Sequence, residues 1–250
     1  MTARVTYSGY LRLEELLGLQ NGLSEGHPDE LHFIVTHQAM ELWFKIMIND
    51  VRRARAHLED GAWTKAAAVL KRLNNVTGNG IAQISTLADM GPAAFNGFRD
   101  VLGSASGLES AQFRVVEVLA GLRTPEYLHS IRALNRGSLP PVVGAALKEP
   151  GLAEAAELAG KKSGVEDWAK VYREPEDYGP IAVMAELLTD FDVLWFRWRA
   201  EHIVLVERMI GRRFTGTGGK SAGYLARTLQ YRFFPFLWEA RNTLYETGMK

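Results

Sequence analysis

The chain has 250 residues, of which 47% are hydrophobic, so it is long enough to form one large domain with a buried core. Its 29 basic and 29 acidic residues leave no net charge, which argues against nucleic acid held by a general positive field. Without cysteine, the chain has no disulfide, thiolate metal ligand or cysteine nucleophile, and no stretch is long and apolar enough to span a bilayer. We expect a cytoplasmic protein with no membrane or nucleic-acid partner.

Almost every periodic signal along the chain is helical, and no alternating β pattern of any length is present. The expected helices, in chain order, cover residues 30–59, 63–90, 110–122, 125–135, 180–211 and 224–246. Pro28 and Asp29 mark the start of the first helix and Gly61 lies beyond its end. The second helix is expected to be interrupted at Gly78 and Gly80. The helix over 180–211 is expected to be the longest, and Pro235 is expected to interrupt the last one.

Two stretches between these helices are less regular. Residues 91–107 are rich in turn formers and predict a structured loop or short helical turns. The stretch around 133–171 contains prolines and alanine-rich turns, and we expect a shortened peripheral helical segment there. Residues 1–250 are therefore predicted to form a single all-α domain, a bundle of long helices.

Two of the long helices each carry one histidine inside an apolar stripe. In the first, positions spaced by four and three place His37 on the same face as Phe33, Met40, Phe44, Met47 and Val51. In the helix over 180–211, His202 is the only ionisable member of such a stripe. Its companions are Ile181, Met184, Leu188, Phe191, Trp195, Trp198, Leu205 and Met209.

A single histidine in such a stripe is more often a buried neutral side chain with hydrogen-bond partners than a metal ligand. Two such stripes in one helical chain shift the comparison toward a metal or cofactor ligand. Histidines among large apolar side chains, without a carboxylate cluster, suit haem better than a hydrated metal ion. No Glu-x-x-His pair and no His-Glu-x-x-His motif is present, and His32 and His37 lie on different helix faces. Haem remains a hypothesis on spacing alone.

The glycine-rich run from Gly216 to Ser221 invites comparison with a phosphate-binding loop. Such a loop requires a glycine where this chain has Phe214, and it follows a strand, whereas a helix precedes this run. The nucleotide hypothesis therefore fails. A flexible connection between helices and a mobile lid both remain open, because glycine permits unusual backbone conformations.

Several motifs occur together in a recognisable order: "TYSGYLRLEELLGLQ", "HPDELHFIVTHQAMELWFK", "FNGFRDVLGSASGLESAQFRVVE", "WRAEHIVLVERMIG" and "GTGGKSAG". In this the chain resembles the haem-dependent tryptophan 2,3-dioxygenase superfamily, over roughly 5–124 and 172–243. The resemblance implies a helical oxidoreductase that encloses haem b and inserts dioxygen across the C2–C3 bond of an indole.

The resemblance also implies roles for individual residues. His202 falls at the position of the axial ligand to the haem iron. His37 falls at the distal histidine beside the indole nitrogen, with Phe33 as a wall of the indole pocket. Arg99 matches the arginine that pairs with the substrate carboxylate, and Thr217 matches the polar contact in the loop over the substrate.

Further matches concern the haem surroundings and the subunit contacts. Ser106 and Gly107 match positions near the haem and the bound substrate. Tyr7, Tyr10 and Leu11 match an N-terminal segment that reaches into a neighbouring subunit's pocket. The resemblance thereby implies a homotetramer.

The sequence also departs from the family pattern, and these departures leave alternatives open. Ala39 and Met40 stand where small polar residues are usual, and Phe95 stands where we would expect tyrosine. One alternative is a monooxygenase of the same superfamily that forms an oxindole or hydroxylated product from a methylated tryptophan. Another is a haem-binding sensor without turnover. We favour ring cleavage of L-tryptophan or a close derivative, because the matched anchors are intact.

Overall fold

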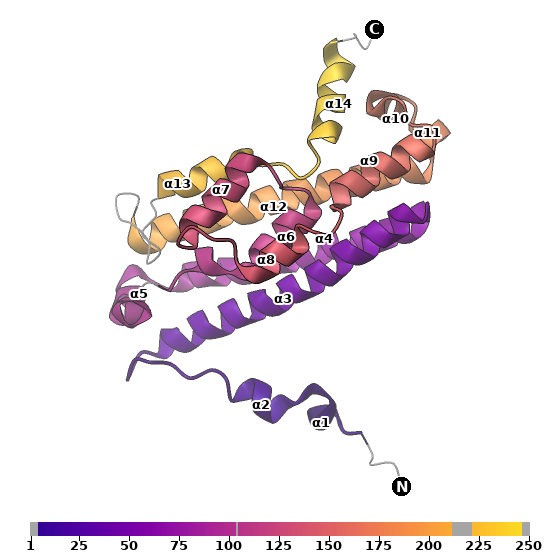
Figure 1. Cartoon of the computed structure of the whole chain (residues 1–250). Helices are drawn as coiled ribbons and strands as arrows, with labels where there is room; N and C mark the ends of the chain where they lie inside the picture. The colour runs from indigo at the N-terminus through magenta and orange to yellow at the C-terminus, as the bar shows by residue number, and fades with distance from the viewer. Residues whose placement is uncertain (1–4, 104, 212–221, 247–250) are drawn as a thin grey trace.

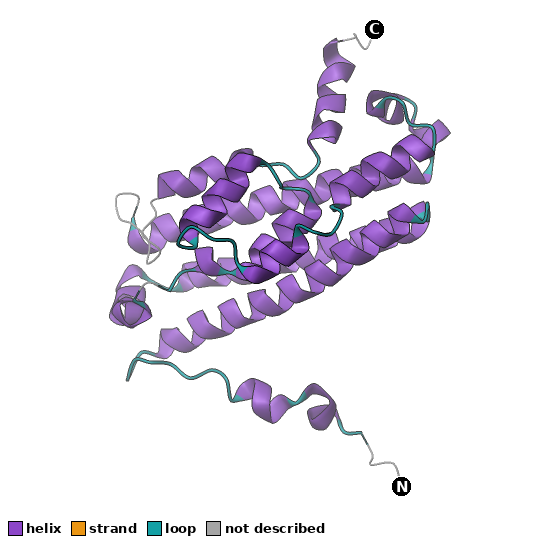
Figure 2. Ribbon diagram, in the orientation of Figure 1, coloured by secondary structure: helices purple, strands orange, loops and turns teal. Residues whose placement is uncertain are grey.

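The computed structural model describes residues 5–103, 105–211 and 222–246, and every regular element in them is helical. Figure 2 shows helices joined by loops. The all-α fold class predicted from the sequence is confirmed. None of the helices in the described part of the chain has the length and apolar character needed to cross a membrane.

Three long helices form the centre of the molecule: α3 (Pro28–Glu59), α4 (Trp63–Ser85) and α12 (Pro180–Ile210). Helix α4 packs against both α3 and α12 (Figure 1). Pro28 opens α3 at a position where its missing N–H costs nothing, and acidic residues in the first turn favour the helix dipole. At the other end, Gly61 has φ +67°, a conformation that glycine adopts readily.

Most members of the two predicted apolar stripes are buried, and Phe33, His37, Trp198 and His202 are half-buried. Met40, Phe44, Met47 and Val51 of α3 are buried, as are Phe191 and Trp195 of α12, and all six belong to the main core. A second, smaller core contains Leu205 and Met209 at the end of α12, together with Ile84, Leu87, Met90, Phe95 and Phe98. The stripe of α12 therefore passes through both cores, and His202 lies between them.

Two details of the predicted helices are wrong. Helix α12 has 31 residues and α3 has 32, so the predicted longest helix is the second longest. Helix α4 also runs through Gly78 and Gly80 without a break. Gly80 is buried where α4 packs on α3, and a Cβ built there would lie 3.4 Å from Cε of Met40, an ordinary van der Waals contact. A glycine in a helix interior costs about 1 kcal/mol relative to alanine, so the tertiary packing of α4 and not the local propensity keeps the helix continuous.

The irregular stretch after α4 consists of short helices. The 3-10 helix η1 (Thr86–Asp89) leads into α5 (Pro92–Arg99), followed by η2 (Asp100–Leu102) and η3 (Gly107–Glu109). The short helical turns expected over 91–107 are thus observed.

Shorter helices cover the central three. Helices α6 (Ala111–Ala120) and α9 (Leu152–Lys162) pack against α3, and α8 (Pro141–Ala146) packs against α6. Leu152 and Ala156 of α9 are fully buried in the main core, so the segment around 133–171 contributes to the interior. Helix α7 (Pro125–Leu134) lies between α6 and α8 in the chain.

The C-terminal part contains α13 (Ala222–Arg227), η4 (Thr228–Gln230) and α14 (Pro235–Glu246). Pro235 begins α14, so the predicted interruption of the last helix is present. Asp192 of α12 accepts hydrogen bonds from the backbone N–H groups of Phe233 and Phe234, at 2.7 and 3.1 Å, and from Nε1 of Trp238 at 2.9 Å. These bonds fix the start of α14 to the body of the molecule.

The N-terminal helices α1 (Tyr7–Leu11) and α2 (Leu13–Leu17) stand away from the bundle, on the side where α3 lies (Figure 1). The chain meets α3 further on, where Nε2 of Gln20 donates to Oε1 of Gln38 at 2.6 Å. Glu30 also accepts bonds from the backbone of Leu23 and Ser24. The first two helices are therefore attached through residues that follow them in the chain.

Candidate functional site

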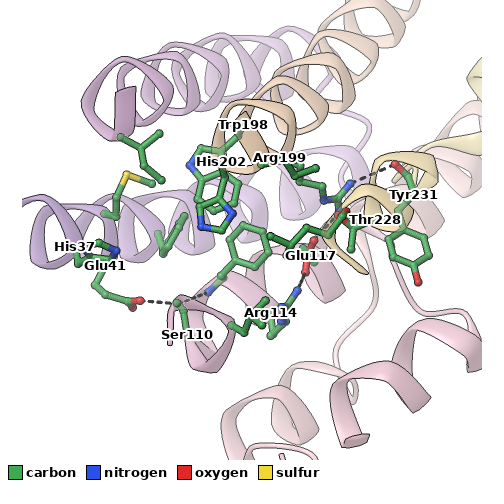
Figure 3. Close-up of a pocket in the computed structure, with 18 of the residues that line it drawn as sticks. His37, Glu41, Ser110, Arg114, Glu117, Trp198, Arg199, His202, Thr228 and Tyr231 are labelled. Atoms are coloured by element: carbon green, nitrogen blue, oxygen red, sulfur yellow. Dashed lines mark hydrogen bonds and ion pairs between the residues drawn. The ribbon is translucent and has the colours of Figure 1, made fainter. Parts of the chain in front are cut away.

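Two adjoining cavities lie between α3, α12 and the segment around η3. Their volumes are about 260 and 430 Å³, and His37 and His202 line both. The cavities also share Glu41, Ile84, Gly107, Leu108, Ser110 and Leu225. Figure 3 shows His37 and Glu41 at one side of the smaller cavity, with His202 and Trp198 nearer its middle. The structure therefore brings together the two histidines that the sequence singled out.

His37 is held in one orientation by the helix that carries it. Its Nδ1 lies 2.7 Å from the backbone carbonyl oxygen of Phe33, and the two rings are 4.1 Å apart. Because a carbonyl only accepts, Nδ1 of the neutral ring carries the hydrogen and Nε2 keeps a free lone pair. Burial lowers the pKa of His37 below 6.5, although the Phe33 carbonyl and Glu41 act in the opposite direction. A neutral imidazole with Nε2 as acceptor results.

His202 lies on α12, one turn after Trp198. The two rings stack at 5.4 Å with an angle of 7° between their planes. Burial, with smaller contributions from His37 and Arg114, lowers the pKa of His202 to about 4. Among the described residues, neither ring nitrogen of His202 has a hydrogen-bond partner. His202 therefore presents a neutral imidazole with an uncommitted lone pair, which is what an axial ligand to haem iron requires.

The larger cavity has an aromatic and aliphatic wall. Phe33 and Phe95 line it, with ring centres 6.0 Å apart, and Leu205 and Met209 of α12 line it as well. Phe95 is buried in the smaller core and also packs against Phe98. The position where we expected tyrosine thus contributes an apolar ring to this wall.

Ser106 and Gly107 lie at the start of η3. Oγ of Ser106 accepts a hydrogen bond from the backbone N–H of Leu108 at 3.3 Å, and Oε2 of Glu109 accepts one from the N–H of Ser106 at 3.4 Å. This reciprocal pair caps the short helix. Ser106 lines the larger cavity and Gly107 lines both cavities. Their proximity to haem and substrate stays a prediction.

Other sequence-predicted residues are not brought to the cavities. Arg99 is the last residue of α5 and is half-buried, but it does not line either cavity. Tyr7 and Tyr10 are each 77% exposed, and Leu11 is also exposed, on the N-terminal helix that stands apart. Thr217 lies outside the described residues. Within one chain, the sequence-predicted residues that line the cavities are the two histidines, Phe33, Ser106 and Gly107.

Sequence reasoning missed a buried charged group in the wall of the smaller cavity. Glu117 of α6 is 1% exposed and accepts hydrogen bonds from Arg114 at 2.8 Å, Arg199 at 2.5 Å and Trp195 at 3.2 Å. The hydroxyl of Tyr127 donates to the same carboxylate. We call Arg114, Glu117, Tyr127 and Arg199 the arginine–glutamate cluster. An Arg–Glu pair three residues apart in the otherwise apolar "FRVVEVLA" was the available signal.

Two buried nitrogen atoms in the cavity wall lack a partner. Nε1 of Trp198 and Nε of Arg114 are both buried, and within the described part of the chain neither forms a hydrogen bond. Buried polar atoms are rarely left unpaired in native proteins, so these two nitrogens leave hydrogen-bonding capacity in the cavity wall that a bound group could use. The described residues contain no group of three or more His, Cys, Asp or Glu side chains arranged to hold a metal ion. A macrocycle with polar substituents, bound through His202, fits these features.

Comparison with known proteins agrees with this geometry. The chain matches the family model described as tryptophan 2,3-dioxygenase over residues 1–136 and 166–244. The residues between these ranges fall within the segment around 133–171 that the sequence set apart. It is 38% identical to a tryptophan 2,3-dioxygenase of Caulobacter vibrioides over 265 residues, which cover 98% of this chain and 100% of that protein.

Relatives from other bacteria give the same result. A tryptophan 2,3-dioxygenase of Bacillus cereus is 35% identical over 264 residues, covering 96% of this chain and 93% of the relative. One from Pseudomonas aeruginosa is 33% identical over 269 residues, covering 97% and 91%. The chain therefore belongs to the tryptophan 2,3-dioxygenase family of haem-dependent oxidoreductases.

Proposed function

We propose that the protein is a haem b-dependent dioxygenase that cleaves the indole 2,3-bond of L-tryptophan or a close derivative to an N-formylkynurenine-type product. The observation that carries this proposal is the placement of His37 on α3 and His202 on α12, which line the same two adjoining cavities. The relatives named as tryptophan 2,3-dioxygenases support the substrate class.

His202 is the residue that would hold the cofactor. Its neutral imidazole would bind the haem iron, and the bound haem would supply the chemistry of dioxygen activation. The flat stack on Trp198 restricts rotation of the imidazole. Gly107 lines both cavities and would lie against the cofactor, where a glycine leaves room for close approach, and Ser106 would lie near the cofactor and the substrate in the larger cavity.

The substrate's indole is proposed to lie in the larger cavity, against Phe33 and Phe95. Nε2 of His37 then accepts the hydrogen bond of the indole N–H, because Nδ1 is committed to the Phe33 carbonyl. This bond orients the ring and excludes water from it. We assign His37 this orienting role and not proton abstraction.

The amino-acid part of the substrate would be held by charged and polar side chains. Arg99, at the end of α5, binds the carboxylate bidentately in this proposal, and Thr217 contacts the same end of the substrate. Phe95 lies one turn before Arg99 on α5 and lines the larger cavity. The helix that carries Arg99 therefore already contributes to the wall of this cavity. Binding the indole through His37 and the carboxylate through Arg99 would position the reacting ring carbon.

Tyr7, Tyr10 and Leu11 are proposed to complete the pocket of a neighbouring subunit in a homotetramer. Their exposure, and the separation of α1 from the bundle, support a role outside their own chain (Figure 1). Helix α3 also exposes an apolar stripe made of Leu31, Val35, Leu42 and Ile46. A stripe of this kind on a long helix is typical of a surface covered by another chain. A cytoplasmic location remains a prediction.

The decisive experiment follows the oxygen atoms. Reduced, haem-loaded protein is mixed with L-tryptophan or β-methyl-tryptophan and isotopically labelled dioxygen, with and without ascorbate, and the product mass is measured. Incorporation of both oxygen atoms without sustained reductant supports the proposal. Incorporation of one atom with reductant-dependent turnover would assign the protein to the monooxygenases. Binding of tryptophan without oxygen consumption would make it a sensor.

Replacing Arg99 with alanine is expected to weaken tryptophan binding to the haem-loaded protein. Loss of one partner of a buried charge pair leaves the carboxylate uncompensated, which costs about 2–5 kcal/mol. The dissociation constant, measured from the change in the haem spectrum, tests this. Arg173, exposed at the end of α10 (Trp168–Arg173), provides the matched control, and its alanine variant should bind normally. Equal affinities for the two variants would remove Arg99 from the site.

Tryptophan binding should also depend on pH through His37. Protonation turns Nε2 from an acceptor into a donor, which opposes the indole N–H. Because the pKa of His37 lies below 6.5, affinity should stay constant from about pH 8 to 6.5 and decrease only at lower pH. Binding titrations across this range test the expectation, with His37→Phe as the variant that lacks the decrease. A decrease centred above pH 6.5 would contradict it.

A further inference from the structure

The arginine–glutamate cluster has a charge imbalance inside the protein. It contains two guanidinium groups and one carboxylate, and the charges of Arg199 and Arg114 hold the pKa of Glu117 below its usual value despite burial. Burial and the neighbouring Glu117 raise the pKa of Tyr127 well above 10, so its phenol is neutral. The cluster therefore carries one excess positive charge. Buried charges in proteins are normally paired, so an excess charge indicates that an anion is missing.

The unpaired donor that accompanies this charge belongs to Arg114. Its side chain is 10% exposed, Nη1 is occupied by Glu117, and Nε is buried without a partner. Arg114 and Arg199 both line the smaller cavity, as does His202. Nη1 of Arg199 has a partner of its own, the backbone carbonyl oxygen of Tyr231 at 3.3 Å. The excess charge and the free donor thus coincide at Arg114, inside the cavity wall.

The other carboxylate of this cavity does not neutralise the cluster. Glu41 accepts hydrogen bonds from Oγ of Ser110 at 2.5 Å and from Nε2 of Gln112 at 2.8 Å. In Figure 3, Glu41 lies beside His37 at one side of the cavity, whereas Glu117 and Arg199 lie at the other, with His202 between them. The charge of the cavity wall is therefore polarised, with its positive end at the arginine–glutamate cluster.

We propose that Arg114 binds a carboxylate of the porphyrin, so that the arginine–glutamate cluster anchors one haem propionate and fixes how the macrocycle is turned about the His202 axis. The inference rests on the proposed haem function. Haem b is apolar over most of its area and carries its carboxylates along one edge. The cavity offers both kinds of lining, since Phe44, Phe113 and Trp198 line it together with the cluster, which lies on the side away from His37 (Figure 3). A guanidinium Nε–H donating to a carboxylate makes a charge-assisted bond.

The test compares haem with its dimethyl ester, in which both carboxylates are neutral. Apo-protein is titrated with each compound in the absence of tryptophan. We expect the wild-type protein to bind haem at least about tenfold more tightly than the ester, equivalent to about 1.4 kcal/mol. In Arg114→Met this preference should largely disappear, because haem binding weakens while ester binding does not. Arg52→Met, which alters an exposed pair with Glu149, should keep the wild-type preference.

The possible outcomes separate the inference from the proposed function. Equal binding of haem and ester by the wild-type protein overturns the inference without requiring any variant to fold. An unchanged preference in Arg114→Met also overturns it. If haem affinity is unchanged in this variant, a separate tryptophan titration of its haem-loaded form that shows weakened binding would assign Arg114 to the substrate's carboxylate. Equal weakening of haem and ester in Arg114→Met would indicate a purely structural role and overturn it too. Failure of the wild-type protein to bind haem at all would instead contradict the proposed function.

Discussion

Replacing His202 with alanine is expected to abolish stable haem binding. Loss of a partner that only supports a metal ligand typically costs 10- to 100-fold in affinity, so removal of the ligand should cost more than about 100-fold. The protein should still fold, because His202 is only partly buried and forms no hydrogen bond among the described residues. Titration of the apo-protein with haem, followed at the Soret band, measures the effect.

Two comparisons make this result specific. Added imidazole should restore haem binding to His202→Ala, since the space beside Trp198 is then open to it. His32→Ala serves as the control, because His32 lies on α3 with Nε2 2.9 Å from Oγ1 of Thr86 and lines neither cavity. Haem bound by His202→Ala with wild-type affinity and an unchanged axial-ligand spectrum would show that another residue holds the iron.

Replacing Glu117 with alanine is expected to lower the free energy of unfolding by about 3–5 kcal/mol, the range for breaking a buried ion pair. The variant leaves the guanidinium groups of Arg114 and Arg199 buried without their carboxylate. Urea unfolding of the apo-protein at neutral pH measures this change. The pKa of Glu117 is lowered in the folded state, so its stabilisation is present above pH 4.5 and is lost as the pH falls toward the folded-state pKa.

A partly exposed carboxylate provides the matched control for Glu117. Glu149 is 29% exposed and pairs with Arg52 at 2.6 Å and Arg55 at 3.0 Å. Solvent screens this pair, so Glu149→Ala should cost about 1 kcal/mol or less. If the two variants were destabilised equally, burial of the Glu117 cluster would not be the source of its contribution.

The long helices were predictable because their signal is local. One face of α12 is apolar from Ile181 to Met209, and a single periodic pattern describes it. The same pattern located His37 and His202, since an imidazole in such a stripe must point inward with its neighbours. The break expected at Gly80 was wrong for the opposite reason. Gly80 lies where α4 packs against Met40 of α3, and this contact between helices has no signature in the sequence near Gly80.

The charged wall of the site was not predictable from spacing. Glu117 and Arg199 are far apart in the chain, and only the packing of α6 against the central helices brings them to 2.5 Å. Read alone, the pair Arg114 and Glu117 resembles an exposed ion pair on a helix surface. Burial distinguishes the two cases, and burial depends on the whole fold. For Arg99 the sequence is the more informative source. Its motif predicts a role in substrate binding, whereas its position in a single chain does not bring it to either cavity.

The contact between Gly80 and Met40 has a consequence for the dimensions of the site. Met40 lines the smaller cavity on one side, and its methyl group lies against the backbone of α4 on the other. Gly80 therefore limits the positions open to the Met40 side chain, although Gly80 does not line the cavity itself. A bulkier residue there would press Met40 inward and narrow the space beside His37. In this chain, the width of the smaller cavity beside His37 therefore depends on a helix position that lines neither cavity.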